Sequence, residues 1–257
     1  MHSPYHASFW IALLVGIASG SVGPFILLRR MALVGDALSH VALPGIALAL
    51  VYGLDPFYGV VVFLVVAALL IFWLEGRSRI PPDAIVGLLF TASLAIGILI
   101  IPNADIIESL FGAFPVLSLP FLLVILSSAA VLAVLCFVLA RRFLFLIVSP
   151  ELAQVHGLGR RYNLALLLVF AMIVALGIKL VGTLLMGALT IIPASIAKNV
   201  SRSMRGYVIL SALVGGAISV GGMWIAATLR FLPGPSIILF GVGLFLLSLA
   251  VGRKRAG

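Results

Sequence analysis

The 257-residue chain is 64 % hydrophobic and only 9 % charged, so it has too few polar side chains to cover a water-soluble globule. This composition identifies an integral membrane protein and leaves no room for a separate soluble domain. Its length allows about eight to ten crossings at ~20 apolar residues each, in one transmembrane domain over residues 1–257. The single cysteine excludes a disulfide framework and a thiolate metal cluster.

Nine apolar runs follow one another along the chain, each near the length that one membrane crossing needs. They lie near residues 9–28, 33–53, 57–74, 84–102, 119–140, 162–178, 180–197, 207–229 and 236–252. We therefore expect an all-α, polytopic bundle of about nine transmembrane helices. The sixth and seventh runs meet at "LGIKLVGT" with almost no polar loop, which fits either a tight hairpin or one long, broken helix.

The distribution of basic residues predicts how these spans are oriented. With the N-terminus outside, the cytoplasmic segments hold 14 of the 16 Lys and Arg residues, and only Lys179 and Arg230 lie outside. The positive-inside rule therefore predicts an N-out, C-in topology. One crossing fewer at residues 178–182 would move Lys198, Arg202 and Arg205 outside, so we expect nine spans. The net charge of +9 then belongs to the membrane surface and does not indicate nucleic-acid binding.

The second run, "MALVGDALSHVALPG" at residues 31–45, carries two ionisable side chains in an apolar context. Asp36 and His40 each cost roughly 2.5 to 3.5 kcal/mol at the centre of a membrane helix. At a spacing of i and i+4 they share one helix face, so a single cation could bind both. The structural alternative is a neutral histidine that is hydrogen-bonded to the aspartate and joins two helices.

Asp83 is a candidate third ligand from another span. It lies four residues beyond Arg79, and Asp36 lies six residues beyond Arg30, so all three polar side chains fall in the cytoplasmic half of the bilayer. An Asp, His and carboxylate set suits Zn(II), Mn(II) or Fe(II), and the absence of nearby Cys or Met ligands argues against Cu(I).

The cytoplasmic loop at residues 141–163 contains "SPELAQVHGLGRR", which predicts a short helix at about 149–161. Ser149 suits the N-cap, Pro150 the first helical position, Glu151 the first-turn dipole and Gly157 the position after the C-cap. The apolar side chains that we expect to face outward are Leu152, Ala153 and Val155. Such a helix either rests on lipid or docks in a groove of a partner protein.

The chain has none of the nucleotide-binding motifs that would let it hydrolyse ATP itself, such as G-x-x-x-x-G-K-[ST]. ATP-driven pumping would therefore require another subunit. An intramembrane enzyme is disfavoured too, because Ser39 lies off the face shared by Asp36 and His40 and cannot align with a base.

Four stretches together resemble the membrane permeases of bacterial zinc and manganese ABC importers, over about residues 10 to 250. They are "RRMALVGDALSHVALPGIALAL", "PDAIVGLLFTASLAIGIL", "SPELAQVHGLGRRYNLALLLVFAMIVALGIKLVGTLLMGALTIIPASIAKNVSRS" and "GPSIILFGVGLFLLSL". The resemblance implies a non-enzymatic permease homodimer in the inner membrane, with no permanent cofactor, two cytoplasmic ATPases and an extracytoplasmic metal-binding protein.

The same resemblance assigns roles to residues. Ser149 to Arg161 matches the family's coupling helix, and Asp36 with His40 matches its in-membrane metal motif. Many members carry Glu immediately before the aspartate that opens the fourth span, where this chain has Pro82, and Asp83 is the residue able to take its place.

Two functions follow from these features. The first is the permease subunit of an ATP-driven importer for a divalent metal, with zinc favoured and manganese or iron as alternatives. The second is a proton-coupled secondary transporter in which Asp36 and His40 relay protons, and this second function needs no coupling helix.

Overall fold

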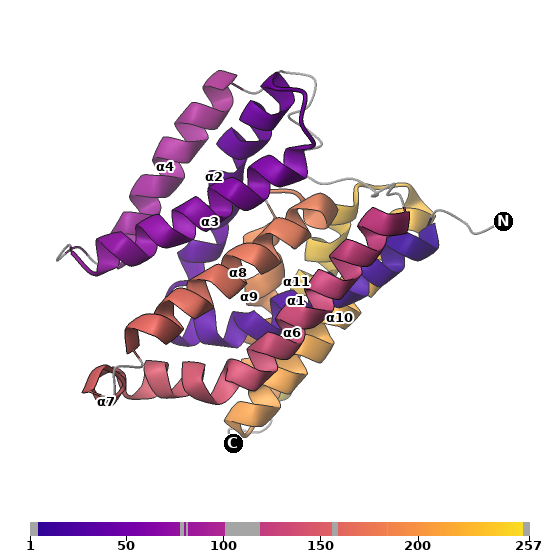
Figure 1. Ribbon diagram of the computed structural model, residues 1–257. Helices are drawn as coiled ribbons and strands as arrows, with labels where there is room; N and C mark the ends of the chain where they lie inside the picture. The colour runs from indigo at the N-terminus through magenta and orange to yellow at the C-terminus, as the bar shows by residue number, and fades with distance from the viewer. Residues whose placement is uncertain are drawn as a thin grey trace.

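The computed structural model describes residues 5–77, 80, 82–100, 119–155, 159–183 and 185–253, and every regular element within these ranges is an α-helix (Figure 1). The helices are α1 (Tyr5–Leu28), α2 (Ala32–Val51), α3 (Pro56–Glu75), α4 (Pro82–Ile100), α6 (Leu119–Val148), α7 (Pro150–Val155), α8 (Gly159–Val181), α9 (Met186–Val200), α10 (Met204–Leu229) and α11 (Pro233–Arg253). This confirms the all-α fold class. Apart from α7, each described helix overlaps one of the nine apolar runs.

The described helices differ in whether they can cross a membrane unaided. Seven are long and apolar enough, namely α1, α2, α3, α6, α8, α10 and α11. The apolar part of α4 is shorter, at Ala84–Gly97, and α9 has 15 residues, which extend ~22 Å against a hydrocarbon core of ~30 Å. The number of crossings therefore stays a prediction.

The helices form two groups, with α8 and α9 between them. Helices α2, α3 and α4 pack on one another, while α1 packs against α6, α9 and α10, and α11 covers α9 and α10. Helix α3 packs on α8 and helix α2 on α9, which joins the α2–α4 group to the rest (Figure 1). Most of the side chains of α8 are buried, so this helix forms part of the core.

Close contact between α1 and α10 depends on small residues. A Cβ atom on Gly215 would lie 2.2 Å from the carbonyl oxygen of Gly16, so no larger residue fits without moving the helices apart. One turn away, the Ser211 hydroxyl donates a hydrogen bond to the carbonyl of Gly20 at 2.5 Å. Small residues spaced by four allow such backbone approach in membrane helices.

The chain reverses direction between α8 and α9. Near its start, α8 contacts the end of α1 through Asn163, and near its end Lys179 pairs with Asp55 at the start of α3, at 3.5 Å. Helix α9 runs parallel to α1, because Thr190 bonds to Ser19 at 2.9 Å and Lys198 lines a pocket with Leu28 at the end of α1. The chain therefore turns back between α8 and α9, where Gly182 has a φ of 82°. The two helices form a hairpin and are not one broken helix.

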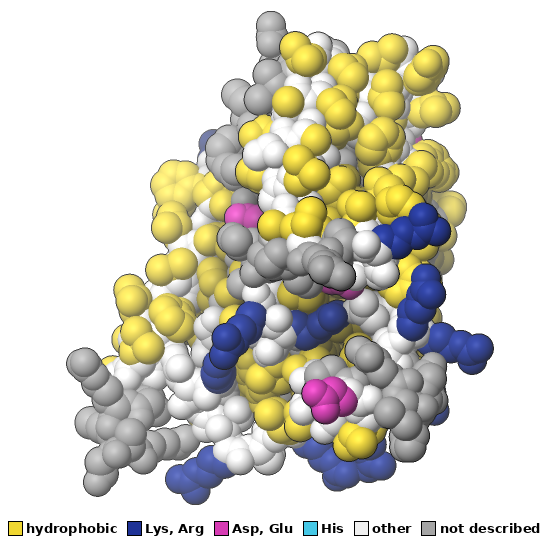
Figure 2. Space-filling model, turned by 90° about the vertical axis from the view of Figure 1, so that its left-hand side faces the viewer, with side chains coloured by type: hydrophobic (Ala, Val, Ile, Leu, Met, Phe, Trp, Pro, Cys, Tyr) yellow, Lys and Arg dark blue, Asp and Glu magenta, His cyan; other side chains and the backbone are white. Residues whose placement is uncertain are grey.

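These helix directions give the molecule a basic end, formed by the ends of α1, α3 and α9 and the starts of α8 and α10. Lys and Arg side chains gather in the lower part of the face shown in Figure 2, and hydrophobic side chains dominate the upper part. Lys179 lies in the last turn of α8 and Arg230 directly follows α10, so both lie at the ends of helices that start at the basic end. The side of the membrane that each end occupies stays a prediction.

One expected loop is mostly helical. Helix α6 continues through Arg141 and Arg142 to Val148, and α7 and the start of α8 occupy most of the remaining residues up to 163. The sequence "RRFLFLIV" contains no Gly or Pro, so nothing interrupts the helix before Ser149 and Pro150.

Candidate functional site

Asp36 and His40 lie one turn apart in the first half of α2, as expected. The helix continues from Ala32 to Val51 with Pro44 inside it. The two side chains differ in accessibility: Asp36 is exposed, whereas His40 is only 7 % exposed. The carboxylate can therefore meet an incoming cation while the imidazole lies within the protein.

The His40 ring packs between α2 and α4. It meets the Phe90 ring edge to face, with centroids 4.9 Å apart and an interplanar angle of 80°. Its Nδ1 atom is buried and has no hydrogen-bond partner among the described residues, so no hydrogen bond from Nδ1 to Asp36 ties the pair together. A buried polar atom without a partner costs ~1–3 kcal/mol, and a bound cation would satisfy a free ring nitrogen.

The start of α9 lies against the Asp36 carboxylate, a contact that was not predicted from the sequence. A Cβ on Gly187 would lie 2.5 Å from Oδ1 of Asp36 and 2.8 Å from its backbone nitrogen. Gly35 faces the same point, because its Cβ would lie 3.3 Å from Cα of Gly187. The sequence signal was the glycine in "LLMGALT", but glycines are common in membrane helices, so it could not single out this position.

Asp83 lies in the first turn of α4, but its side chain is outside the described residues. Helices α2 and α4 run in the same direction, since His40 meets Phe90 and, further along, Leu43 meets Gly97. Asp83 precedes Phe90 by two turns, ~10 Å along the helix, and so lies on the side of His40 where Asp36 is found. Among the described residues, no three His, Cys, Asp or Glu side chains lie close enough together to hold one metal ion, and the third ligand stays a prediction.

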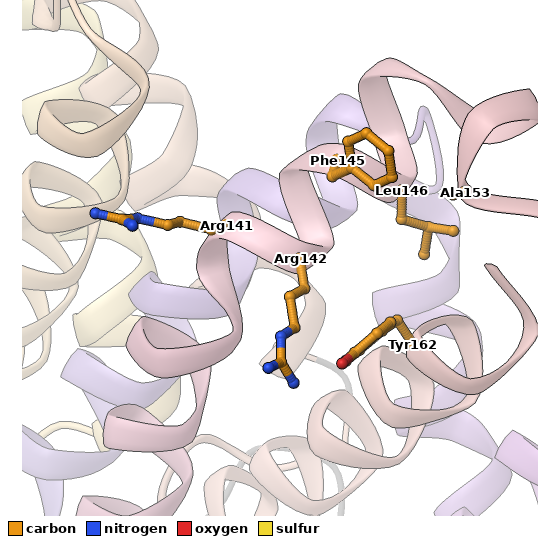
Figure 3. A pocket seen from close by; sticks show the side chains of 6 residues that line it. All are labelled: Arg141, Arg142, Phe145, Leu146, Ala153 and Tyr162. Atoms are coloured by element: carbon orange, nitrogen blue, oxygen red, sulfur yellow. The ribbon is translucent and has the colours of Figure 1, made fainter. Parts of the chain in front are cut away.

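Helix α7 begins at Pro150 as predicted, and the Ala153 N–H donates to the Ser149 carbonyl at 3.0 Å. Glu151 lies in the first turn, and Leu152 is 55 % exposed. The expectation that Ala153 faces outward was wrong, because this residue is 1 % exposed and faces the corner between α6 and α8 (Figure 3). A short helix joined closely to two others must pack one face on them, and a small side chain suits that tight contact.

For three of the residues proposed to bind a partner, the structure does not describe the side chain. Pro150 and Val155 belong to the helix, but their side chains lie outside the described residues, as does Gly157. Their roles, like the partner-binding role of α7 itself, stay predictions.

A polar network joins three helices at the basic end. The Asn163 amide of α8 donates to Oε2 of Glu75 on α3 at 2.8 Å and accepts a hydrogen bond from Arg29, which follows α1. Burial lowers the pKa of Arg29, and the carboxylate of Glu75 partly offsets this effect. This network could not be predicted from the sequence, because polar residues at span ends are also typical of simple interface anchors.

Ser39 shows no sign of nucleophile activation. Its hydroxyl donates to the Gly35 carbonyl one turn earlier, at 2.7 Å, as buried serines in helices commonly do.

Known proteins are similar to this chain in sequence and in fold over almost its whole length. The model of the ABC 3 transport family matches residues 2–252. The manganese import system permease protein ScaB of Streptococcus gordonii is 33 % identical over 250 residues, which cover 95 % of this chain and 90 % of that protein. The high-affinity zinc uptake system membrane protein ZnuB of Haemophilus influenzae is 31 % identical over 251 residues, covering 93 % and 95 %.

A solved structure agrees. PsaBC from Streptococcus pneumoniae in complex with Fab contains a chain that superposes with a TM-score of 0.82 and 32 % identity, over 95 % of this chain and 90 % of that one. The protein is therefore a member of the ABC 3 transport family, a multi-pass protein of the bacterial inner membrane.

Proposed function

We propose that this chain is the permease subunit of an ATP-driven importer that moves a divalent transition metal across the inner membrane. Family membership supports the transport class, and the relatives named for manganese and for zinc support the kind of substrate. The observation that carries the proposal is the pair on α2, an exposed Asp36 one turn from a buried His40 whose Nδ1 has no partner among the described residues.

The two side chains bind the cation one after the other. The exposed carboxylate of Asp36 attracts the metal and replaces part of its water shell, and His40 then supplies a nitrogen ligand from inside the protein. Metal binding also neutralises the carboxylate, whose charge is expensive in a medium of low dielectric constant. Asp83 on α4 is the proposed third ligand.

The surroundings of the pair explain how the site could open and close. Asp36 and His40 both lie on α2, whereas Gly187 of α9 lies against one side of Asp36 and Phe90 of α4 packs on His40. A shift of α9 or α4 relative to α2 would therefore change access to the metal without breaking the ligand pair apart.

Zinc and manganese are the main candidates for the transported ion, and iron is the third. The histidine nitrogen favours zinc, which binds nitrogen-containing sites more tightly than manganese does. The relatives carry both names: two that are 33 % identical are named for manganese, and one that is 31 % identical is named for zinc.

The proposed partners are a cytoplasmic ATP-binding subunit, an extracytoplasmic metal-binding protein and a second copy of the permease. Helix α7 supports the first of these, because it lies beyond the basic ends of α6 and α8 and presents Leu152 to the outside. Family membership disfavours the proton-coupled secondary transporter, in which such a helix would have no role.

Coexpression with the neighbouring operon genes tests the proposal. We expect an ATPase to copurify with the chain, and the complex in proteoliposomes to take up radioactive zinc or manganese only when ATP and the metal-binding protein are present. Uptake driven by a proton gradient without ATP would overturn the proposal in favour of the secondary transporter. Competition between the two metals in the same assay identifies the preferred ion.

A further inference from the structure

A cavity of about 140 Å³ lies where α6, α7 and α8 meet (Figure 3). Its lining residues are Arg141, Arg142, Phe145, Leu146, Ala153 and Tyr162. The floor is apolar, and the charged groups of this lining are both guanidiniums, with no carboxylate among the six. A cavity of roughly this volume accommodates a group about the size of benzene, so it can hold one part of a larger ligand.

The two arginines are exposed and form no ion pair with the described residues. The Arg142 guanidinium lies 5.2 Å from the centroid of the Tyr162 ring, and Figure 3 shows it extending toward that ring. Arg141 extends in a different direction, and its long exposed side chain can turn back toward the cavity. Two cations therefore border an apolar space, and no acidic side chain of the described residues forms an ion pair with them.

An exposed apolar stripe on α6 leads to this cavity. Val131, Val134, Val138 and Phe145 lie on one helical face by their spacing, and all are exposed, at 63 %, 60 %, 67 % and 37 %. In a membrane the valines of this stripe face acyl chains, and Phe145 continues the stripe about one turn past the two arginines at the basic end. An occupant with an acyl chain and an anionic head matches both parts of the surface.

We propose that this corner binds an anionic phospholipid of the leaflet at the basic end. The phosphate pairs with Arg142 and Arg141, and an acyl chain lies along the exposed valines of α6, Val134 and Val138. Guanidiniums bind phosphate through charge-assisted hydrogen bonds, and basic pockets between membrane helices are suited to anionic headgroups. A bound lipid would also brace α7 against α6, because Ala153 of α7 lines the same cavity.

Native mass spectrometry of the purified full-length chain tests this proposal, by titration with phosphatidylglycerol and separately with phosphatidylcholine. We expect Arg141→Gln/Arg142→Gln to weaken phosphatidylglycerol binding on the order of tenfold, with little change for phosphatidylcholine. Arg141→Lys/Arg142→Lys keeps both positive charges and should retain most of the binding. The matched control Arg202→Gln/Arg205→Gln removes two charges elsewhere at the basic end and should bind nearly as well as the unmodified chain.

The other outcomes overturn the proposal. Equal losses in the Gln double variant and in the matched control would show only general attraction to a basic surface. Displacement of phosphatidylglycerol by millimolar inorganic phosphate would show an anion site with no lipid selectivity. Unchanged lipid binding in the Gln double variant, combined with loss of ATPase association, would assign the corner to the protein partner.

Discussion

Replacing Asp36 or His40 by alanine should abolish metal uptake while the protein still reaches the membrane and binds its ATPase. Each variant removes one of two ligands on the same face of α2, which leaves the cation too few donors to replace its water shell. Ser39→Ala is the matched control, because this side chain donates only to the Gly35 carbonyl, and it should keep uptake near that of the unmodified chain. Radioactive metal uptake measures the effect, and full uptake by either ligand variant would rule out the site.

Gly187→Ala should impair transport without removing a ligand. The added methyl would lie 2.5 Å from Oδ1 of Asp36, so α9 must move away from α2 or the carboxylate must turn from its position. Overpacking of this kind typically costs ~1–3 kcal/mol. Gly87→Ala on α4 is the control, because a Cβ there meets nothing within 4 Å. Uptake at a series of metal concentrations distinguishes a weaker site from a lower maximal rate, and unchanged uptake in Gly187→Ala would refute the contact.

At the residue scale, the sequence was enough to find side chains whose presence in a membrane helix costs free energy. It was not enough to find residues whose role comes from contact with another helix. Asp36 and His40 could be found because ionisable groups in an apolar run need a compensating role. The burial of Ala153 could not be found, because the sequence shows that α7 is apolar but not which side meets α6 and α8. Gly187 was missed for the same reason, since its role comes from Asp36 on another helix.

At the scale of single helices, the two faces of α7 should respond differently to a charge. Leu152→Arg should abolish ATPase association and leave the thermal stability of the permease unchanged, because Leu152 is 55 % exposed. Ala153→Arg should lower both, because a long charged side chain must enter the corner between α6 and α8. Copurification and melting of the isolated permease measure the two effects. If Leu152→Arg keeps both the ATPase and uptake, α7 is an interfacial helix that rests on lipid.

The connection among α1, α3 and α8 should depend on Asn163. Asn163→Ala leaves Arg29 and Glu75 partly buried without their shared partner, which costs ~1–3 kcal/mol for the lost hydrogen bonds. Asn199→Ala is the comparison, since the Asn199 amide donates one neutral hydrogen bond to Ser248 at 3.0 Å, and its loss should cost about 1 kcal/mol or less. Denaturation of the purified protein in detergent compares the two variants, and equal losses would contradict a bridging role for Asn163.

At the scale of the whole molecule, apolar periodicity and length were enough to predict an all-α bundle, because membrane spans must satisfy their backbone hydrogen bonds internally. The ends of the helices were harder to predict. Helix α6 extends beyond the end of its apolar run, through Arg141 and Arg142. Helix α9 begins at Met186, later than the start of its apolar run near residue 180. The direction of α9 comes from contacts such as Ser19 with Thr190, which join residues far apart in sequence and leave no local signal.

The orientation of the bundle in the membrane is the prediction on which the functional assignment of both ends depends. In a Cys136→Ala background, a cysteine at Ser201 should react with a membrane-impermeant reagent only from the cytoplasm, and one at Leu54 only from outside. Ser201 follows α9 at the basic end, beside Lys198 and Arg202, and positive charge next to a span resists translocation. Leu54 lies in the turn between α2 and α3 and is 58 % exposed. A cysteine at Ser109, in the expected outer loop that lies outside the described residues, should behave like the one at Leu54. If the cysteines at Ser201 and at Leu54 are both labelled from outside, α9 does not complete a crossing. The orientation of α10 and α11 in the membrane would then be the reverse of the prediction. The first five spans, and with them the depth of Asp36, His40 and Asp83, would keep their positions.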